Sequence, residues 1–191
     1  MKRKLIKEKC SVQHVQRCME RTQKIKMESM EMDIKGKEIL DACCGGMMFY
    51  FDKDHDKLLT MDRRHGEEDL SRFGRSNLMI EPDIIGDFKD LPFPDESFYH
   101  IIFDPPHLIH GGDNSYMIQK YGKLNKDSWK EDISKGFKEC FRVLKHHGTM
   151  VFKWSECQIK INEILKCFDK KPLYGNKNGS GHTYWFVFYK E

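Results

Sequence analysis

Ile39-Leu40-Asp41-Ala42-Cys43-Cys44-Gly45-Gly46 is the stretch of this chain that decides its fold. An apolar run ends there in a carboxylate, and small residues follow at once. Short apolar runs bounded by turn residues are typical of buried strands. Glycine gives the backbone access to positive φ and lets a ligand approach the main chain closely. The stretch therefore predicts a buried strand that ends at a ligand site.

Three further apolar runs also end in aspartate, namely Leu58–Asp62, Asp83–Asp87 and Phe98–Asp104. Ligands of open parallel sheets bind outside the carboxyl ends of the strands. We therefore expect four acids along one rim of one sheet: Asp41, Asp62, Asp87 and Asp104. The alternative is that aspartate stands at these positions only as a turn residue, which does not explain the particular neighbours of each one.

The segments that follow complete an alternating α/β pattern with a hairpin at its end. The predicted helices run from Asp127 or Ser128 to about Lys145 and over Ile159–Phe168, and the predicted strands cover Thr149–Trp154, Lys171–Gly175 and Thr183–Tyr189. Residues 47–51 are predicted to form a short helical turn, 63–81 to be irregular, and 107–125 to form a mobile loop. Lys153, at the end of the fifth strand, either faces the site or is a surface lysine, and the second interpretation is favoured.

The composition indicates a cytoplasmic globular protein without a membrane partner. The chain has 191 residues, of which 39% are hydrophobic and 33% charged, with seven cysteines and no CxxC pair. No stretch has the length of a membrane span, and the basic N-terminus lacks the apolar core of a signal peptide. We therefore expect reduced thiols. The sequence makes no prediction about oligomeric state.

Basic residues gather in the first segment, although the net charge is only +3. Ser11 is predicted to cap a helix that runs to about Met32. We predict that residues 1–35 form a basic helical extension packed on the domain, and that residues 36–191 form the domain itself. The basic segment is either a footprint for nucleic acid phosphates or a solvated helix face.

The pattern resembles the class I S-adenosylmethionine-dependent methyltransferases from about Lys37 onward. Four signals carry the resemblance, in the family's order and spacing: Leu40–Gly46, Asp62, Gly86–Phe98 and Arg142–Phe152. The resemblance implies a Rossmann-like α/β fold. It has a mostly parallel seven-stranded sheet, an antiparallel C-terminal hairpin and helices on both faces. The chain departs from the family where Cys43 and Met47 replace two motif glycines, and where His146-His147-Gly148 replaces the usual Pro-Gly-Gly turn.

The resemblance also implies S-adenosyl-L-methionine as cofactor, with S-adenosyl-L-homocysteine as product, and assigns its contacts. The methionine end is assigned to Asp41, Ala42, Cys43, Cys44 and Gly45, with Asp104 beside them. Asp62, with Arg63 next to it, is assigned to the ribose, because one carboxylate accepts hydrogen bonds from two adjacent hydroxyls. The adenine is assigned to Asp87, which accepts from its amine, and to the N–H of Phe88, which donates to a ring nitrogen.

Asp104-Pro105-Pro106-His107 resembles the Asp/Asn-Pro-Pro-aromatic motif of methyltransferases that act on exocyclic amino groups. The implied catalytic residues are these four. A carboxylate and a backbone carbonyl accept the two protons of the amine and turn its lone pair toward the methyl group, and the prolines hold that carbonyl in place. His107 stands where an aromatic ring stacks on the base. The alternative is a rigid turn without chemistry. His107 and His110 lack further metal ligands, so we expect no metal.

The sequence therefore predicts a methyltransferase that modifies adenine N6 or cytosine N4 of DNA or RNA by direct in-line transfer. A base in duplex DNA must then leave the stack. Phosphate contacts are assigned to the basic N-terminal segment and to Lys120, Lys123, Lys126 and Lys130. Two alternatives stay open. One is a methyltransferase for a small molecule or a protein, and the other is a catalytically weak cofactor-binding protein.

Overall fold

The central strands are short, apolar and buried. The structure is a computed structural model that describes residues 34–176 and 182–191, and Gly36–Glu191 form one compact unit within it. Every residue of β2 (Leu58–Asp62) is buried, and Leu40 of β1 (Ile39–Asp41) has no exposed surface. The basic helix predicted within residues 1–35 lies outside the described residues and stays a prediction.

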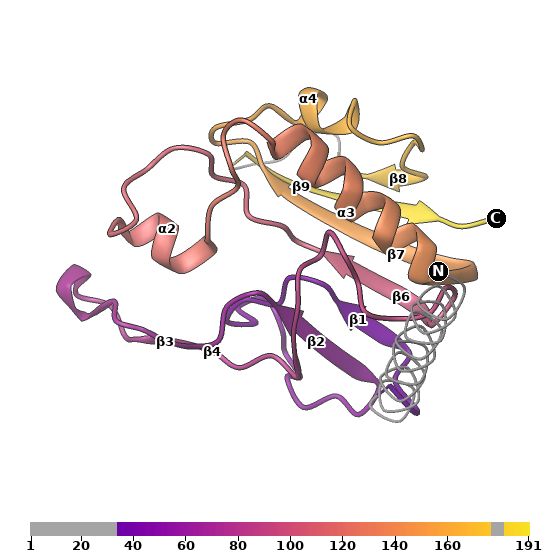
Figure 1. The fold of residues 1–191 in the computed structure, drawn as a ribbon, viewed down its shortest axis with the longest axis horizontal. Coiled ribbons are helices and arrows are strands. Elements are labelled where there is room, and N and C mark those ends of the chain that lie inside the picture. The colour runs from indigo at the N-terminus through magenta and orange to yellow at the C-terminus, as the bar shows by residue number, and fades with distance from the viewer. Residues whose placement is uncertain (1–33, 177–181) are drawn as a thin grey trace, which may run out of the picture. The chain divides into compact units, whose positions relative to one another are not determined.

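Seven strands of the described residues form one sheet in the order β5-β2-β1-β6-β7-β9-β8. Leu40 pairs in parallel with Leu59 of β2 on one side and with Ile101 of β6 on the other. The remaining strands are β5 (Ile84–Ile85), β6 (Phe98–Phe103), β7 (Leu144–Ser155), β8 (Tyr174–Gly175) and β9 (Thr183–Tyr189). β5, β2, β1, β6 and β7 are parallel, whereas β9 and β8 run antiparallel at the edge (Figure 1). The predicted mostly parallel sheet with a C-terminal hairpin is confirmed.

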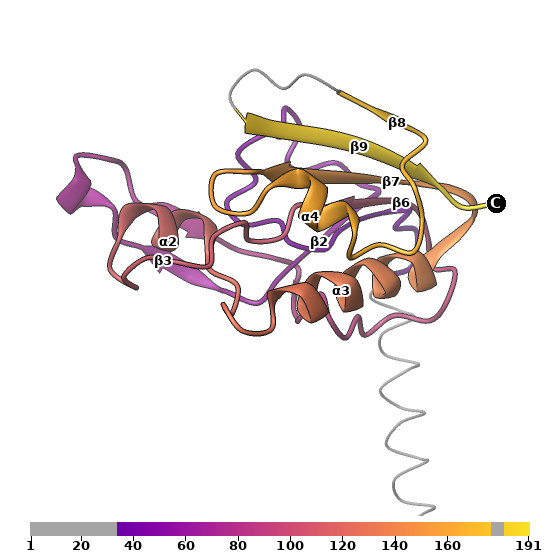
Figure 2. The ribbon, with the colours of Figure 1, turned by 90° about the horizontal axis from the view of Figure 1, so that it is seen from above.

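Helices α3 (Trp129–Val143) and α4 (Ile161–Leu165) lie on the same side of β7 and β9 (Figure 2). Phe168, just after α4, stacks on Phe137 of α3 at 4.0 Å and also contacts Phe152 of β7 at 5.0 Å between ring centroids. Lys153, the next residue along β7, points to the opposite face of the sheet, because side chains alternate along a strand.

The opposite face of the sheet carries turns rather than a helix in residues 42–57, so within the described residues α3 and α4 cover one face only. Met47 adopts a positive φ of 51°, which a right-handed helix does not allow. The polar run Asp52–Asp56 then offers no apolar stripe to bury. These two features explain why the predicted helical turn at 47–51 is absent.

Arg142 of α3 holds the segment that leads from β5 to β6. Its guanidinium donates to the carbonyl of Phe93 at 2.8 Å, to the carbonyl of Leu91 at 2.9 Å and to the carboxylate of Asp95 at 2.8 Å. Glu139, one turn earlier, accepts from Arg142 and from the N–H of Leu91. Two of the segments that carry the family resemblance, Gly86–Phe98 and Arg142–Phe152, are therefore joined by the hydrogen bonds of Arg142.

Two segments contain secondary structure that the sequence pattern did not indicate. Residues 63–81, predicted to be irregular, form an antiparallel hairpin of β3 (Gly66–Glu68) and β4 (Leu78–Ile80) around a short 3-10 helix, Ser71–Phe73. Within the loop predicted at 107–125, Ser115 caps the six-residue helix α2 (Tyr116–Tyr121). α2 lies beyond the carboxyl ends of the strands (Figure 1). None of the helices in the described part of the chain is long and apolar enough to cross a membrane.

Candidate functional site

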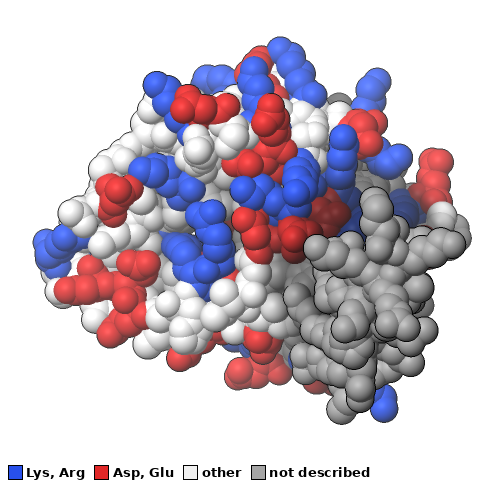
Figure 3. All heavy atoms as spheres, viewed as in Figure 1, with Lys and Arg blue, Asp and Glu red and all other residues white. Residues whose placement is uncertain are grey.

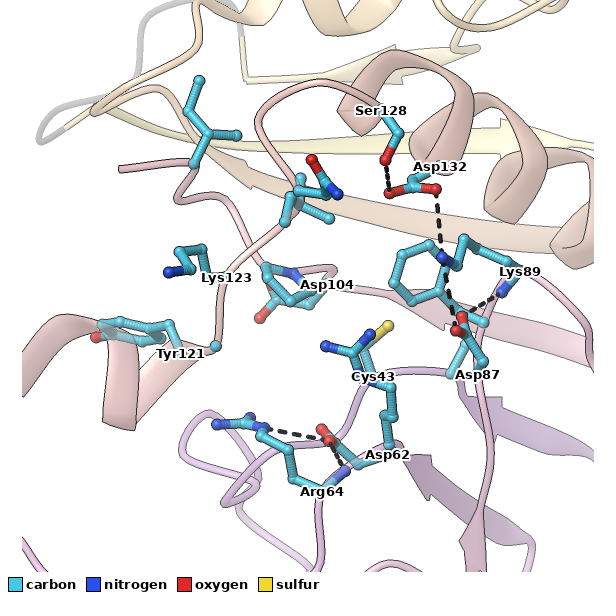
Figure 4. Close-up of a pocket in the computed structure, with 18 of the residues that line it drawn as sticks. Cys43, Asp62, Arg64, Asp87, Lys89, Asp104, Tyr121, Lys123, Ser128 and Asp132 are labelled. Carbon is cyan, nitrogen blue, oxygen red and sulfur yellow. Dashed lines mark hydrogen bonds and ion pairs between the residues drawn. The ribbon is translucent and has the colours of Figure 1, made fainter. Parts of the chain in front are cut away.

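Three of the four strand-end acids line one cavity of about 580 Å³. Asp62 is the last residue of β2, and Asp87 and Asp104 come just after β5 and β6. The carboxyl ends of these parallel strands lie at one edge of the sheet. Figure 4 places Asp104 and Cys43 at the middle of this cavity, Asp62 and Arg64 on one side, and Asp87 with Lys89 on the other. The parallel register thus brings together acids that are up to 42 residues apart in the sequence.

Asp41, the fourth acid, lies beneath the turn and not in the wall of the cavity. It has no exposed surface, accepts from the hydroxyl of Tyr50 at 2.7 Å and accepts from the N–H of Cys43 at 3.0 Å. Burial raises the pKa of Asp41 from 3.8 to about 7, although both hydrogen bonds oppose the rise. Asp41 therefore supports the turn that follows β1 from below.

The rest of the turn after β1 contributes main chain and small side chains. Ala42 and Cys43 line the cavity, and Cys44 is buried beside them. Gly45 adopts a φ of 51° and donates its N–H to Asp62 at 2.9 Å. Burial raises the pKa of the Cys43 thiol well above its ordinary value, and the carboxylate of Asp41 adds to the effect. The thiol at the middle of the cavity is therefore neutral.

Asp62 connects the turn to the segment after β2. Its Oδ1 accepts from the N–H of Arg64 at 2.8 Å and from Nε of the same residue at 3.3 Å, while Oδ2 accepts from Gly45. The guanidinium of Arg64 also donates to the carbonyl of Gln119 in α2 at 3.2 Å. Arg63, assigned beside Asp62, is exposed and lines the same cavity.

The other end of the cavity carries a second group of charges. Oδ1 of Asp87 accepts from the N–H of Lys89 at 3.0 Å, and the ammonium of Lys89 lies 3.3 Å from Asp132 of α3. Phe88 lines the cavity and packs edge-on against Phe103 at 5.5 Å. Gly136 makes room for this ring, because a Cβ there would lie 2.4 Å from Phe88.

The Asp104–His107 segment separates the first cavity from a second one of about 240 Å³. Asp104 and Cys43 line both, Pro106 lines the first, and Pro105 and His107 line the second. His107 is buried, with its ring 5.1 Å from that of Tyr121. Burial lowers the pKa of His107 to about 4, and the charge of Lys153 contributes. The imidazole is therefore a neutral ring near pH 7.

Lys153 is a site residue for which the sequence interpretation favoured the wrong one of two alternatives. Its ammonium forms an ion pair with Oδ2 of Asp104, and its side chain is only 22% exposed, so its interpretation as a surface lysine is wrong. The alternation along β7 carried a signal: Phe152 and Trp154 are apolar and buried, so Lys153 between them points to the other face. Tyr50, whose hydroxyl reaches Asp41, was missed.

The four lysines assigned to phosphates occupy different surroundings. Lys123 and Lys126 line the first cavity and Lys120 lines the second, while Lys130 lies over the ring of Trp129. Lys123 is paired with Asp113 at 2.7 Å. Within residues 34–176 and 182–191, no group of three or more histidine, cysteine or acidic side chains is placed to hold a metal ion.

Comparisons with known proteins support the fold. No family model and no curated protein matches this chain. TrmN from Thermus thermophilus is similar in structure, with a TM-score of 0.50 and 14% identity over 86% of this chain, which spans 48% of TrmN. The PH0226 protein from Pyrococcus horikoshii OT3 gives a TM-score of 0.47 and 19% identity, with 90% of this chain and 91% of that one covered.

A third similar structure is described as a SAM-dependent methyltransferase from Aquifex aeolicus. Its TM-score is 0.42 and its identity 12%, with 85% of this chain and 90% of that chain covered. Identities at this level concern architecture only. The strand order, together with the likeness to TrmN, confirms the predicted Rossmann-like α/β fold.

Proposed function

We propose that this protein is an S-adenosylmethionine-dependent methyltransferase that acts on an exocyclic amino group of a nucleic acid base, adenine N6 or cytosine N4. One observation carries the proposal. Asp104, at the end of β6, stands where a large cavity lined by strand-end acids meets a smaller cavity lined by rings. A methyl donor and an acceptor held in the two cavities would meet at this carboxylate.

The residues around the larger cavity fit the cofactor. Its volume of about 580 Å³ lies within the range of small-molecule sites. Asp62 offers a carboxylate to the ribose hydroxyls, and its Oδ2, which accepts only from the N–H of Gly45, keeps a further lone pair for them. Asp87 and the N–H of Phe88 match the amine and ring nitrogen of adenine. Ala42, Cys43 and Asp104 then border the methionine end.

Asp41 serves the cofactor through the turn and not by direct contact, since it lies outside the wall of the cavity. Its bond to the N–H of Cys43 sets the path of the chain at Ala42–Cys43. Gly45 and its bond to Asp62 then join the methionine end of the site to the ribose end. These two aspartates therefore hold the glycine-poor turn in shape where the family motif uses more glycine.

When bound, S-adenosylmethionine would supply a methyl group on a cationic sulfur. The acceptor nitrogen would form a bond to the methyl carbon while the carbon–sulfur bond breaks, and the sulfur would leave as a neutral thioether. Oδ2 of Asp104 is paired with Lys153, so Oδ1 accepts a hydrogen bond from one N–H of the amine, and the carbonyl of Pro105 accepts one from the other N–H. The nitrogen lone pair is thereby directed at the methyl group. Asp104 takes up the proton that the product nitrogen loses and passes it to water.

The smaller cavity supports a flat acceptor. Phe49, His107 and Tyr121 line it, and a volume of about 240 Å³ suits a single base more than a peptide segment. Cations at the cavities support a phosphate-bearing substrate: Arg63, Arg64, Lys120, Lys123 and Lys126. On the face that Figure 3 shows, basic and acidic side chains are interspersed among the coloured residues, so on this face local cations would hold the strand.

Labelled-methyl transfer from S-adenosylmethionine to DNA, RNA and cell extract in parallel tests the proposal. We expect label in DNA or RNA with the wild type and a loss of at least about 100-fold with Asp104→Ala. Asp56→Ala, at a side chain 85% exposed, is the matched control and keeps full activity. Label only in small molecules or protein would contradict the nucleic acid substrate, and full transfer by Asp104→Ala would contradict the amine mechanism.

A further inference from the structure

The ammonium of Lys153 lies where three parts of the site meet. It pairs with Oδ2 of Asp104, and it lies over the ring of Phe49 at 5.1 Å and over the ring of Trp185 at 5.6 Å. Phe49 belongs to the turn after β1, and Trp185 pairs with Lys153 across the antiparallel β7–β9 ladder. Two aromatic faces and one carboxylate therefore hold this cation in one place.

The same contacts connect Lys153 to the cofactor turn. Phe49 stacks on Tyr50 with 4.9 Å between ring centroids, and Tyr50 donates to Asp41. Asp41 and Asp104 thus lie at the two ends of one chain of contacts that passes through Lys153. A shift of Lys153 would therefore affect the carboxylate of Asp104 directly and the turn after β1 through Phe49 and Tyr50.

Burial favours the neutral form of Asp104, and Lys153 favours its ionised form. The side chain of Asp104 is 18% exposed, and burial raises the pKa of its carboxyl, whereas the charge and hydrogen bond of Lys153 lower it. The titratable and charged groups that lie around Asp104 include Asp41, Cys43, Tyr50, Asp62, Arg64, His107, Lys120, Tyr121, Lys123, Lys126 and Lys153. Arg64 is already paired with Asp62, which leaves Lys153 as the partner of Asp104.

We propose that Lys153 is a positioning residue: it keeps Asp104 ionised and engages Oδ2, so that Oδ1 is the oxygen left to accept the acceptor amine. The proposal rests on the proposed function and adds to it a residue outside the Asp104–His107 motif. A neutral Asp104 carries a proton on one oxygen and loses acceptor capacity. Without the cation, the buried carboxylate would also lack its partner, which is costly.

The test compares Lys153→Met, Lys153→Arg and the control Lys160→Met, which changes a lysine that is 70% exposed. We expect Lys153→Met to lower kcat about 10- to 100-fold with little change in the KM for S-adenosylmethionine. The acid limb of its pH–rate profile should move up by about one pH unit or more. Lys153→Arg should restore most of kcat and the position of that limb, and Lys160→Met should match the wild type.

A second readout needs no turnover. The carboxyl carbon-13 resonance of Asp104, assigned with Asp104→Asn, should titrate at higher pH in Lys153→Met than in the wild type. If the wild type transfers no methyl group, the proposed function fails while this titration still decides whether Lys153 controls Asp104. An unchanged titration, or an unchanged kcat in a folded Lys153→Met protein, overturns the proposal.

The double variant Asp104→Asn, Lys153→Met guards against a folding defect, because it removes both charges and leaves none buried alone. We expect it to unfold at a higher temperature than Lys153→Met, whose Asp104 carboxylate is left without its cation. Its residual transfer should equal that of Asp104→Asn, since Lys153 acts through Asp104. A further large loss of transfer in the double variant would mean that Lys153 acts independently of Asp104 and would also overturn the proposal.

Discussion

Tyr50 donates a hydrogen bond of 2.7 Å to Oδ2 of Asp41, a carboxylate with no exposed surface. The pair lies directly beneath the turn that the proposed methionine end of the cofactor would contact. Because burial raises the pKa of Asp41 from 3.8 to about 7, the folded protein binds a proton there that the unfolded chain has released above about pH 4. Stability should therefore fall as pH rises from 4 through 7.

Asp41→Asn should remove this pH dependence. Between pH 4 and 8 the wild type should lose up to about 4 kcal/mol of unfolding free energy relative to the variant, an order-of-magnitude figure for the rise in the pKa of Asp41. Urea unfolding at pH 4, 6 and 8 measures the difference. Asp56→Asn serves as control, and parallel curves for the wild type and Asp41→Asn would contradict the prediction.

Because of His107, we expect the unfolding free energy to rise with pH between about 4 and 6.5, opposite in direction to the effect of Asp41. The pKa of His107 is lowered from 6.5 to about 4 by burial, so the contribution of His107 to stability is complete above about pH 6.5 and is lost as pH falls through 4. His107→Phe keeps a ring against Tyr121 and cannot be protonated. Relative to this variant, the wild type should lose up to about 3 kcal/mol between pH 7 and 4. Denaturant unfolding at these two pH values measures it, and a constant difference would argue against a buried neutral imidazole.

Arg142→Met should destabilise the protein and weaken the adenine end of the site together. The variant leaves the carbonyls of Leu91 and Phe93 without their donor, for a loss of about 2 kcal/mol after allowance for partial exposure. Thermal unfolding with and without S-adenosylhomocysteine measures both effects. Arg75→Met, at an exposed arginine, is the control. An unchanged melting temperature would show that Arg142 does not hold residues 91–95.

Gly136→Ala should destabilise the protein even though alanine is the better helix former by about 1 kcal/mol. The added Cβ would lie 2.4 Å from Cδ2 of Phe88 and 2.9 Å from Cζ of Phe103, so the ring of Phe88 must move. We expect lower stability and weaker binding of S-adenosylhomocysteine. Ser134→Ala in the same helix is the control, and a more stable Gly136→Ala protein would contradict the close packing at Phe88.

The sequence predicted the sheet better than the segments between its strands. The predicted ranges Leu58–Asp62 and Thr183–Tyr189 agree with β2 and β9, because both are mostly apolar runs with clear ends, which are typical of buried strands. β7 extends beyond the predicted Thr149–Trp154, since Leu144 pairs with Phe98 of β6 at one end and Ser155 pairs with Thr183 of β9 at the other. The β3–β4 hairpin was missed because Gly66-Glu67-Glu68 carries no apolar alternation.

The site was predicted in part, for a related reason. An acid at the end of an apolar run can be recognised from the neighbouring residues alone. Asp62, Asp87 and Asp104 could therefore be placed at one edge of the sheet from the sequence pattern. Burial of Asp41 under its own turn depends on Tyr50, nine residues later, and that contact has no periodic signature. Lys153 meets Asp104 across 49 residues of sequence, so only the sheet register could reveal that pair.

Calorimetric titration with S-adenosylhomocysteine tests the central claim most directly, because it asks only whether the cavity at the strand ends binds this ligand. We predict binding at one site per chain, and a dissociation constant about 10- to 100-fold higher for Asp62→Ala, which lacks the acceptor for the ribose hydroxyls. Asp56→Asn should bind like the wild type. Absence of binding to the wild type at millimolar ligand, or equal affinity of Asp62→Ala, would contradict the account.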